Sequence, residues 1–133
     1  MWDGYNEFYG RHGAAALPDA VTQSTWSRFF DPAEPMHALV AESNGQILGM
    51  VHYLFHRTTV DIALTCYLLD LFTSASARGA GVGRALIEAV HEQAQTAGSA
   101  RVYWQTQETN ETAMRLYNQV AERSGFIVYR MPC

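Results

Sequence analysis

Three glycines at alternate positions, flanked on both sides by arginine, form the segment of this chain with the clearest chemical meaning. An apolar run ends just before it, and a helical pattern begins within it. Glycine has no Cβ, so its backbone can approach an anion closely and turn at positive φ. A helix N-terminus adds free N–H groups and a favourable dipole. The sequence therefore predicts a phosphate-binding loop, made of Arg78, Gly79, Ala80, Gly81, Val82, Gly83 and Arg84.

The spacing of these glycines excludes two common nucleotide-binding motifs. A dinucleotide-binding fingerprint needs glycine or alanine at its sixth position. Counting from Gly79 that position is Arg84, and counting from Gly81 it is Leu86. A P-loop needs a lysine after its last glycine, and this chain has none. A flexible loop without a ligand is the alternative, but glycines between a strand and a helix, beside two arginines, favour anion binding.

Asn110 and Tyr117 lie at the start and on one face of the last long helical pattern. Asn110 stands where a helix N-cap is expected, and that role alone would explain it. Tyr117 shares an apolar stripe with Ala113, Leu116 and Val120. The spacing by itself therefore leaves core packing as an alternative to chemistry for Tyr117.

Acidic and imidazole side chains give several candidates for acid–base chemistry. Asp70 interrupts an apolar strand pattern, where it could accept a proton, anchor a cationic substrate or make only a structural hydrogen bond. His52 and His56 are four residues apart on a predicted strand and so share a face, and either could relay a proton. Glu108 precedes the helix of Tyr117. No set of ligands at metal-binding spacing is present, so no metal site is predicted.

Composition narrows the class of protein. The 133 residues are 48% hydrophobic and 17% charged, with a net charge of −4, which fits one globular domain and excludes a disordered chain. All nine basic residues are arginine, and the acidic balance argues against nucleic-acid binding. We expect no membrane span, because no apolar stretch is long enough. Two cysteines, Cys66 and Cys133, without a signal-peptide pattern, favour free thiols in the cytoplasm.

The elements that must position these residues follow from periodicity and turn signals. We expect helices over residues 2–9, 18–30, 82–97 and 111–123, the third ending at Gly98. We expect strands over residues 37–42, 47–55, 62–73, 101–106 and 126–130. Asn44-Gly45 joins the first two strands as a hairpin. This order predicts an α/β fold with a mixed sheet and helices packed on it.

The loop and its neighbours resemble a known family. Residues 78–83 match the Arg/Gln-x-x-Gly-x-Gly/Ala pyrophosphate signature of the GNAT superfamily of acetyl-CoA-dependent N-acetyltransferases. Residues 67–73 resemble the strand before that loop, and residues 110–117 its Asn-x-x-Ala-x-x-Leu-Tyr helix. The likeness spans about residues 37–130. The sequences of residues 103–108 and 120–121 are similar to those found in the branch with histone- and polyamine-type acetyltransferases.

This resemblance implies a fold and a set of roles. It implies a mostly antiparallel GNAT-like sheet in one domain, with residues 1–36 on the acceptor side and residues 37–130 holding acetyl-CoA. The loop would bind the pyrophosphate, and main-chain groups of Leu71, Phe72 and Thr73 would bind the pantetheine arm, together with Asn110. Tyr117 would be the general acid that protonates the leaving thiolate. The aromatic first helix, with Tyr5, Phe8 and Tyr9, would line the acceptor cleft, and core packing is the alternative role for these side chains.

Two departures from the family pattern affect these expectations. Polyamine acetyltransferases have a Glu-Asp pair on the central strand, where this chain has Leu69-Asp70, so Asp70 is the remaining candidate catalytic acid or base. The family's first strand precedes its first helix, and here no strand pattern precedes the helical pattern of residues 2–9. A shortened chain, a misplaced start and a sheet edge shared with a second copy are all open explanations. Since an uncovered edge favours pairing, we expect a homodimer.

The leading function from the sequence is an N-acetyltransferase that moves an acetyl group from acetyl-CoA to a primary amine in a ternary complex. The acceptor would be a small amine, a polyamine or a lysine side chain. One alternative, favoured by the missing acid at Leu69, is a non-catalytic acyl-CoA sensor or interaction module on the same fold. Another is a different acyl donor or an O-linked acceptor.

Overall fold

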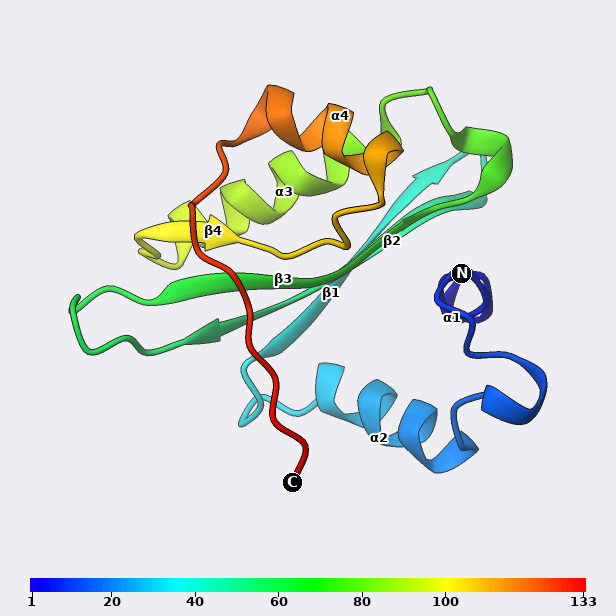
Figure 1. Cartoon of the computed structure of the whole chain (residues 1–133), viewed down its shortest axis with the longest axis horizontal. Coiled ribbons are helices and arrows are strands. Elements are labelled where there is room, and N and C mark those ends of the chain that lie inside the picture. The colour runs from blue at the N-terminus through cyan, green and yellow to red at the C-terminus, as the bar shows by residue number, and fades with distance from the viewer.

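A computed structural model describes all residues 1–133 as one mixed sheet with helices on both faces (Figure 1). The helices α3 and α4 lie on one face of the sheet, and α1 and α2 lie on the other. In chain order the elements are α1 (Trp2–Phe8), η1 (Gly13–Ala15), α2 (Asp19–Phe29), β1 (Met36–Ser43), β2 (Gln46–His56), β3 (Thr65–Thr73), η2 (Ala75–Ala77), α3 (Val82–Thr96), β4 (Arg101–Tyr103) and α4 (Glu111–Val120). The expected α/β fold with a mixed, mostly antiparallel sheet is confirmed.

The strands follow one another across the sheet in the order β1-β2-β3-β4. The first three pair antiparallel, and β4 pairs with β3 in parallel after the chain crosses through α3. The predicted hairpin between β1 and β2 is present, with positive φ at both Asn44 and Gly45. Positive φ at two successive residues gives the twist that a two-residue hairpin needs.

The hydrophobic core lies between the sheet and α3. Val51 on β2, Cys66 on β3 and Val90 on α3 are completely buried at its centre. The apolar residues of α3 recur at helical spacing, so one stripe faces the sheet while the opposite face meets solvent. This helix ends as predicted, with Gly98 at positive φ just beyond it. The core therefore fixes the start of α3 against the end of β3.

Packing is less extensive on the other face of the sheet. The helix α1 buries Tyr5 and Asn6, whereas α2 buries no residue. Gly4 of α1 lies directly against the ring of Phe72 on β3. This face therefore combines a closely packed short helix with a more exposed one, and it is the face expected to meet an acceptor.

Two features of β3 shape the region around Asp70. The pairing with β2 shifts register, so that His52 lies opposite Asp70 while the next residue, Tyr53, lies opposite Leu68. Leu69 is therefore the extra residue of a β-bulge. On its other side, β3 pairs with β4 only over residues 65–67. From Leu68 to Thr73 that edge has no partner strand.

Several predicted elements were too long, and one prediction was wrong. The third strand begins at Thr65, because Asp61 accepts a hydrogen bond from the Ala63 N–H in a turn and Ile62 is 93% exposed. The strand expected over residues 101–106 ends at Tyr103, and the last helix ends at Val120, where Ala121 becomes extended.

The strand expected over residues 126–130 is absent. These residues alternate in a way that suits a strand, but they meet no neighbouring strand within the chain. Phe126 and Tyr129 are 90% and 88% exposed. A strand needs a partner for its backbone groups, so the pattern alone did not produce one.

Candidate active site

The glycine loop runs from the end of β3 through η2 to the start of α3. Gly79 and Gly81 have φ of +79° and +81°, a conformation that other residues adopt at a cost. A Cβ added at either position would meet no atom within 4 Å. Both glycines therefore serve the backbone turn and face open space, as a loop that receives a ligand must.

Gly83 has a different role from the other two glycines. It lies within α3 at ordinary helical φ. A Cβ there would come within 3.3 Å of Leu116 on α4 and 3.7 Å of the Thr73 hydroxyl. Gly83 therefore allows α4 and the end of β3 to lie close to the first turn of α3.

The start of α3 offers free backbone donors. Gly81 is the N-cap and supplies no side-chain hydrogen bond. The first helical bond runs from the Ala85 N–H to the Gly81 carbonyl, and the N–H groups of residues 82–84 have no acceptor within the protein. Three unpaired N–H groups and the helix dipole fit a pyrophosphate.

The two arginines beside the loop are placed differently. Arg78 is exposed and makes no hydrogen bond through its side chain, so it is free to reach a phosphate. Arg84 donates a hydrogen bond to the side-chain carbonyl of Gln119 on α4. Its guanidinium therefore links the two helices, and the main-chain N–H is the part of Arg84 directed to the loop.

The unpaired part of β3 presents residues to both faces of the sheet. Leu71 packs against the core under α3, and Thr73 approaches Gly83. Phe72 points to the opposite face, where it meets Gly4 and the edge of the Tyr5 ring at 6.4 Å between centroids. The backbone groups between these side chains are available on the edge that β4 leaves open.

Tyr117 lies on α4 and Asn110 directly precedes that helix, which lies on the same face of the sheet as α3. The Asn110 side chain accepts a hydrogen bond from the Ala113 N–H at 3.4 Å, so its predicted N-cap role is confirmed. Tyr117 packs against the edge of the Trp104 ring, with 5.4 Å between centroids. Burial, and to a lesser extent the nearby phenol of Tyr9, raises the pKa of Tyr117 to about 12. Tyr117 therefore keeps its proton at neutral pH and remains a hydrogen-bond donor.

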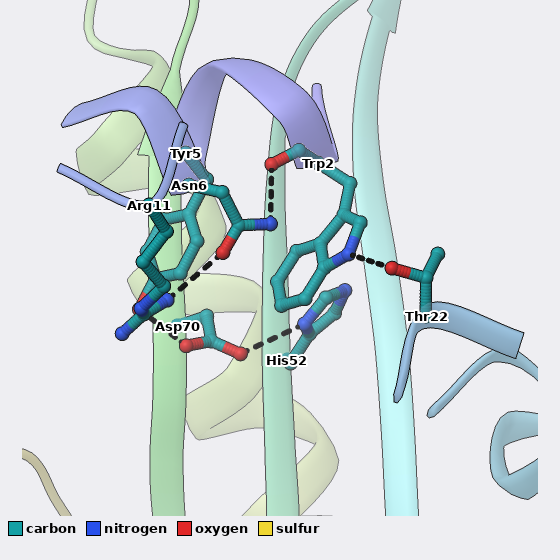
Figure 2. A network of polar contacts seen from close by, with 7 residues as sticks. All are labelled: Trp2, Tyr5, Asn6, Arg11, Thr22, His52 and Asp70. Atoms are coloured by element: carbon teal, nitrogen blue, oxygen red, sulfur yellow. Dashed lines mark hydrogen bonds and ion pairs between the residues drawn. The ribbon is translucent and has the colours of Figure 1, made fainter. Parts of the chain in front are cut away.

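Asp70 lies at the centre of a polar network between the sheet and α1 (Figure 2). One carboxylate oxygen accepts a hydrogen bond from the Tyr5 hydroxyl, and the other lies 2.9 Å from Nδ1 of His52. Burial, followed by the hydrogen bond to Asp70 and its charge, raises the pKa of Tyr5. The phenol is therefore a fixed donor to the carboxylate. The Asp70 side chain is still 21% exposed, so a further group can reach it.

Aromatic rings enclose His52 in this network. The rings of Trp2 and Phe29 lie 5.4 Å and 4.6 Å from the imidazole, and the side chain is only 9% exposed. Because Nδ1 faces a carboxylate, it donates the hydrogen bond of this pair, and Nε2 lies on the opposite side of the ring. No buried polar side-chain atom lacks a partner, and Nε2 makes no hydrogen bond, so it is reached by solvent.

The fold brings together only some of the acid–base candidates. Asp70 and His52 are directly bonded, whereas His56 bonds the hydroxyl of Tyr103 further along the sheet. Glu108 is exposed in the turn before α4. No three His, Cys, Asp or Glu side chains lie close enough to hold a metal. None of the helices has the length and hydrophobicity needed to cross a bilayer.

Sequence reasoning missed Arg11 and the hydrogen bond between Tyr5 and Asp70. The first helix was expected to line an acceptor cleft because it is aromatic, but no pattern linked Tyr5 to a carboxylate 65 residues away. Arg11 comes just after α1. At Gly10 the chain turns with positive φ, and the guanidinium of Arg11 lies back over the rings of Tyr5 and Tyr9.

Known proteins with the same features identify the family. The chain is 33% identical over 98% of its length to D-amino-acid N-acetyltransferase HPA3 of Saccharomyces cerevisiae, of which it covers 80%. It is 32% identical over 97% of its length to the uncharacterized N-acetyltransferase YhfO of Bacillus subtilis, of which it covers 85%. Similarity to the histone- and polyamine-type branch in particular does not follow from these matches.

Solved structures share the fold at low sequence identity. An integron cassette protein from the mobile metagenome of V. cholerae matches with a TM-score of 0.78 at 23% identity, over 98% of this chain and 81% of that one. The aminoglycoside acetyltransferase HMB0005 from a soil metagenome matches with a TM-score of 0.78 at 19% identity, over 97% and 85%. The model of the acetyltransferase (GNAT) family matches residues 1–121. With its glycine loop, open strand edge and sheet order, the chain belongs to the GNAT family of acetyltransferases.

Proposed function

We propose that the protein transfers an acetyl group from acetyl-CoA to a primary amine by direct attack in a ternary complex. One observation carries the proposal. The open edge of β3 has free helix N–H groups at one end and the partly exposed carboxylate of Asp70 within it. An acyl donor bound along this edge would therefore lie beside a group that can accept a proton from the attacking amine.

The residues that would hold acetyl-CoA fit its chemistry. The pyrophosphate needs anion donors, which the loop from Arg78 to Gly83 and the N–H groups of residues 82–84 supply. The amide groups of the pantetheine arm need backbone partners, which the edge at Leu71, Phe72 and Thr73 offers. The side-chain amide of Asn110, which donates a hydrogen bond to Thr106, would offer the pantetheine arm a further polar partner. When bound, acetyl-CoA supplies the acetyl group already activated as a thioester.

Residues of the chain would then accept the proton of the amine and stabilise the departing thiolate. Asp70 takes a proton from the attacking amine, and His52 and Tyr5 hold its two oxygens in place. Tyr117 donates a hydrogen bond to the departing sulfur. Its pKa of about 12 makes complete transfer of its proton to a thiolate unfavourable, so we assign it stabilisation of the thiolate, with solvent completing the protonation.

The acceptor class is supported in part by a relative. The yeast relative is named as an enzyme of D-amino acids, so amino acids belong beside polyamines and lysine peptides as candidate acceptors. A non-catalytic acyl-CoA sensor is the alternative, and it is favoured by Leu69, an apolar residue on the bulge beside Asp70. An O-linked acceptor or another acyl donor would use the same loop and edge.

Release of free CoA thiol distinguishes these functions. Acetyl-CoA is offered with a panel of polyamines, amino acids, lysine peptides and alcohols, and propionyl-CoA is offered in parallel. Saturable, amine-dependent release of CoA is the expected result. Tight acetyl-CoA binding without release on any amine would instead support the sensor. Release only with alcohols, or only with propionyl-CoA, would support the third function.

We also propose that the protein acts as a cytoplasmic homodimer. Support comes from the outer edge of β1, an eight-residue strand with no neighbour on that side. The apolar residues Phe126, Tyr129 and Met131 are also almost fully exposed in a single chain. Sedimentation velocity across a range of protein concentrations should give the mass of two chains, and the mass of one chain throughout would contradict the proposal.

A further inference from the structure

Arg11 is a charged side chain at the site for which the proposed chemistry gives no role. It follows α1 and lies over two tyrosine rings, with its guanidinium carbon 5.7 Å from the Tyr5 centroid and 5.3 Å from that of Tyr9. Its Nη1 donates to the side-chain oxygen of Asn6 at 2.9 Å. Asn6 is itself buried and tied to the Trp2 carbonyl. The guanidinium is therefore held in one place.

Arg11 forms no ion pair within the protein. No carboxylate lies within 4 Å of it, since the sole ion pair of the chain joins His52 and Asp70. One of its terminal nitrogens bonds Asn6, which leaves the other free. A guanidinium presents two parallel donors that match a carboxylate. A fixed, partly buried arginine without an acidic partner is suited to bind an anion from solution.

The position of Arg11 relative to Asp70 suggests which anion. The guanidinium of Arg11 lies over the rings of Tyr5 and Tyr9, and the Tyr5 hydroxyl donates to Asp70, so the two charged groups contact the same phenol (Figure 2). An α-amino acid carries its amine and its carboxylate on one carbon atom. It could place the amine at Asp70 and the carboxylate at Arg11 together.

The surroundings of Arg11 restrict the rest of such an acceptor. Arg11 borders a cavity of about 510 Å³ between α1, η1 and α2. Three carboxylates, Asp3, Glu7 and Asp19, line the same cavity. They disfavour a second negative charge on the acceptor, because like charges at short distance repel. Neutral and basic side chains are therefore preferred to acidic ones.

We infer that Arg11 binds the carboxylate of a free α-amino acid and so selects this acceptor class over simple amines and polyamines. The inference rests on the proposed N-acetyltransferase function but concerns a different step, the choice of acceptor. Arg11 is a specificity residue here, and Asn6 is the residue that positions it.

The test compares two acceptors that differ only in the carboxylate, phenylalanine and phenethylamine. Phenylalanine is offered as each of its two enantiomers. Because the two amines differ in basicity, the measured quantity is the kcat/KM for phenylalanine divided by the kcat/KM for phenethylamine, compared between variants. In Arg11→Gln this ratio should fall at least about tenfold, because a charge-assisted pair of hydrogen bonds is lost. Arg11→Lys keeps the charge but loses the fork and should restore part of the ratio.

Two further variants separate specificity from structure. Asn6→Asp would give Arg11 a carboxylate within the chain and should lower the ratio as Arg11→Gln does. Arg123→Gln removes an exposed arginine that makes no hydrogen bond and should leave the ratio unchanged. Aspartate should be a poorer acceptor than alanine in the wild-type protein. An unchanged ratio in Arg11→Gln, with both acceptors still acetylated, would overturn the inference.

Direct binding keeps the inference separate from the proposed function. Phenylalanine is titrated by calorimetry into the wild-type protein and into Arg11→Gln, both saturated with CoA. Binding that depends on Arg11, without acetylation of any amine, would support the carboxylate site and refute the transferase. Equal binding, or no binding to either protein, would refute the carboxylate site.

Discussion

The carboxylate of Asp70 and Nδ1 of His52 lie 2.9 Å apart on directly paired positions of two neighbouring strands. The bulge at Leu69 makes this possible, since without the extra residue the alternation of β3 would continue and Asp70 would face the α3 side. The imidazole therefore holds the one carboxylate that is both at the open strand edge and partly exposed.

If Asp70 is the base, Asp70→Asn should lower kcat by about 10²–10⁴-fold, because the amide cannot take a proton. The affinity for acetyl-CoA should stay close to that of the wild type, since Asp70 is not among the residues expected to bind the cofactor. Steady-state CoA release and acetyl-CoA titration measure the two quantities. His52→Gln is the matched variant: it removes the partner of the carboxylate but not the carboxylate, so a smaller loss is expected. Wild-type turnover in Asp70→Asn would rule out the base assignment.

Tyr117→Phe should lower turnover by about 10- to 100-fold while leaving the affinity for acetyl-CoA nearly intact. The hydroxyl is lost, but the ring still packs against Trp104. Tyr129→Phe is the control, because that phenol is 88% exposed and distant from any packed ring. If Tyr117→Phe turns over like the wild type, Tyr117 serves only the packing of α4.

Gly81→Ala should weaken acetyl-CoA binding by about tenfold or more. The left-handed conformation costs a residue with a Cβ about 1–2 kcal/mol, and the loop would relax away from the geometry that presents its N–H groups. Isothermal titration with acetyl-CoA measures the loss. Ala80→Gly is a useful comparison, since it changes the same loop without adding a Cβ at positive φ. Normal affinity in Gly81→Ala would count against the pyrophosphate cradle.

Gly49→Ala should destabilise the fold by about 1–3 kcal/mol. A Cβ there would lie 2.8 Å from the Phe72 carbonyl oxygen and 2.9 Å from side-chain atoms of both Val82 and Leu86. Gly49 therefore sets how closely β2, β3 and the start of α3 approach. Urea unfolding measures the change, and Gly83→Ala, whose contact at 3.3 Å is looser, should cost less. Equal stability of Gly49→Ala and the wild type would show that this junction can move apart freely.

Stability should fall as pH rises above about 10. The folded state raises the pKa of Tyr5, and that of Tyr117 to about 12, above the ordinary value of 10. Between pH 10 and 12 the unfolded chain therefore releases protons that the folded chain retains, which favours unfolding. Below pH 10 both states keep these protons, and neither phenol affects the pH dependence.

Tyr117 should lower the free energy of unfolding by on the order of 2 kcal/mol once the pH reaches the pKa of this residue in the folded state. Urea unfolding at pH 9, 10, 10.5, 11 and 11.5 measures how the free energy of unfolding falls with pH across this range. Tyr117→Phe should flatten this dependence, and Tyr5→Phe should do so as well. A slope as steep in the double variant as in the wild type would assign the alkaline loss to other groups.

The sequence by itself determined the parts of this protein that depend on neighbours in the chain. The Asn44-Gly45 hairpin, the Asn110 cap, the stop at Gly98 and the glycine loop before α3 all follow from which backbone angles and local hydrogen bonds those residues allow. Together with the sequence motifs, they were enough to predict the four strands of the sheet and the family, and to place the glycine loop at the start of α3.

Only the tertiary structure decided which side chains meet around Asp70. The bonds from Tyr5 and His52 to Asp70 join residues 65 and 18 positions apart, and Arg11 reaches the site because α1 docks on Phe72. The strand pattern of residues 126–130 gave no strand, since a strand requires a partner and none is near. Local preferences set the conformation of a segment, but the packing of distant segments decides which side chains meet.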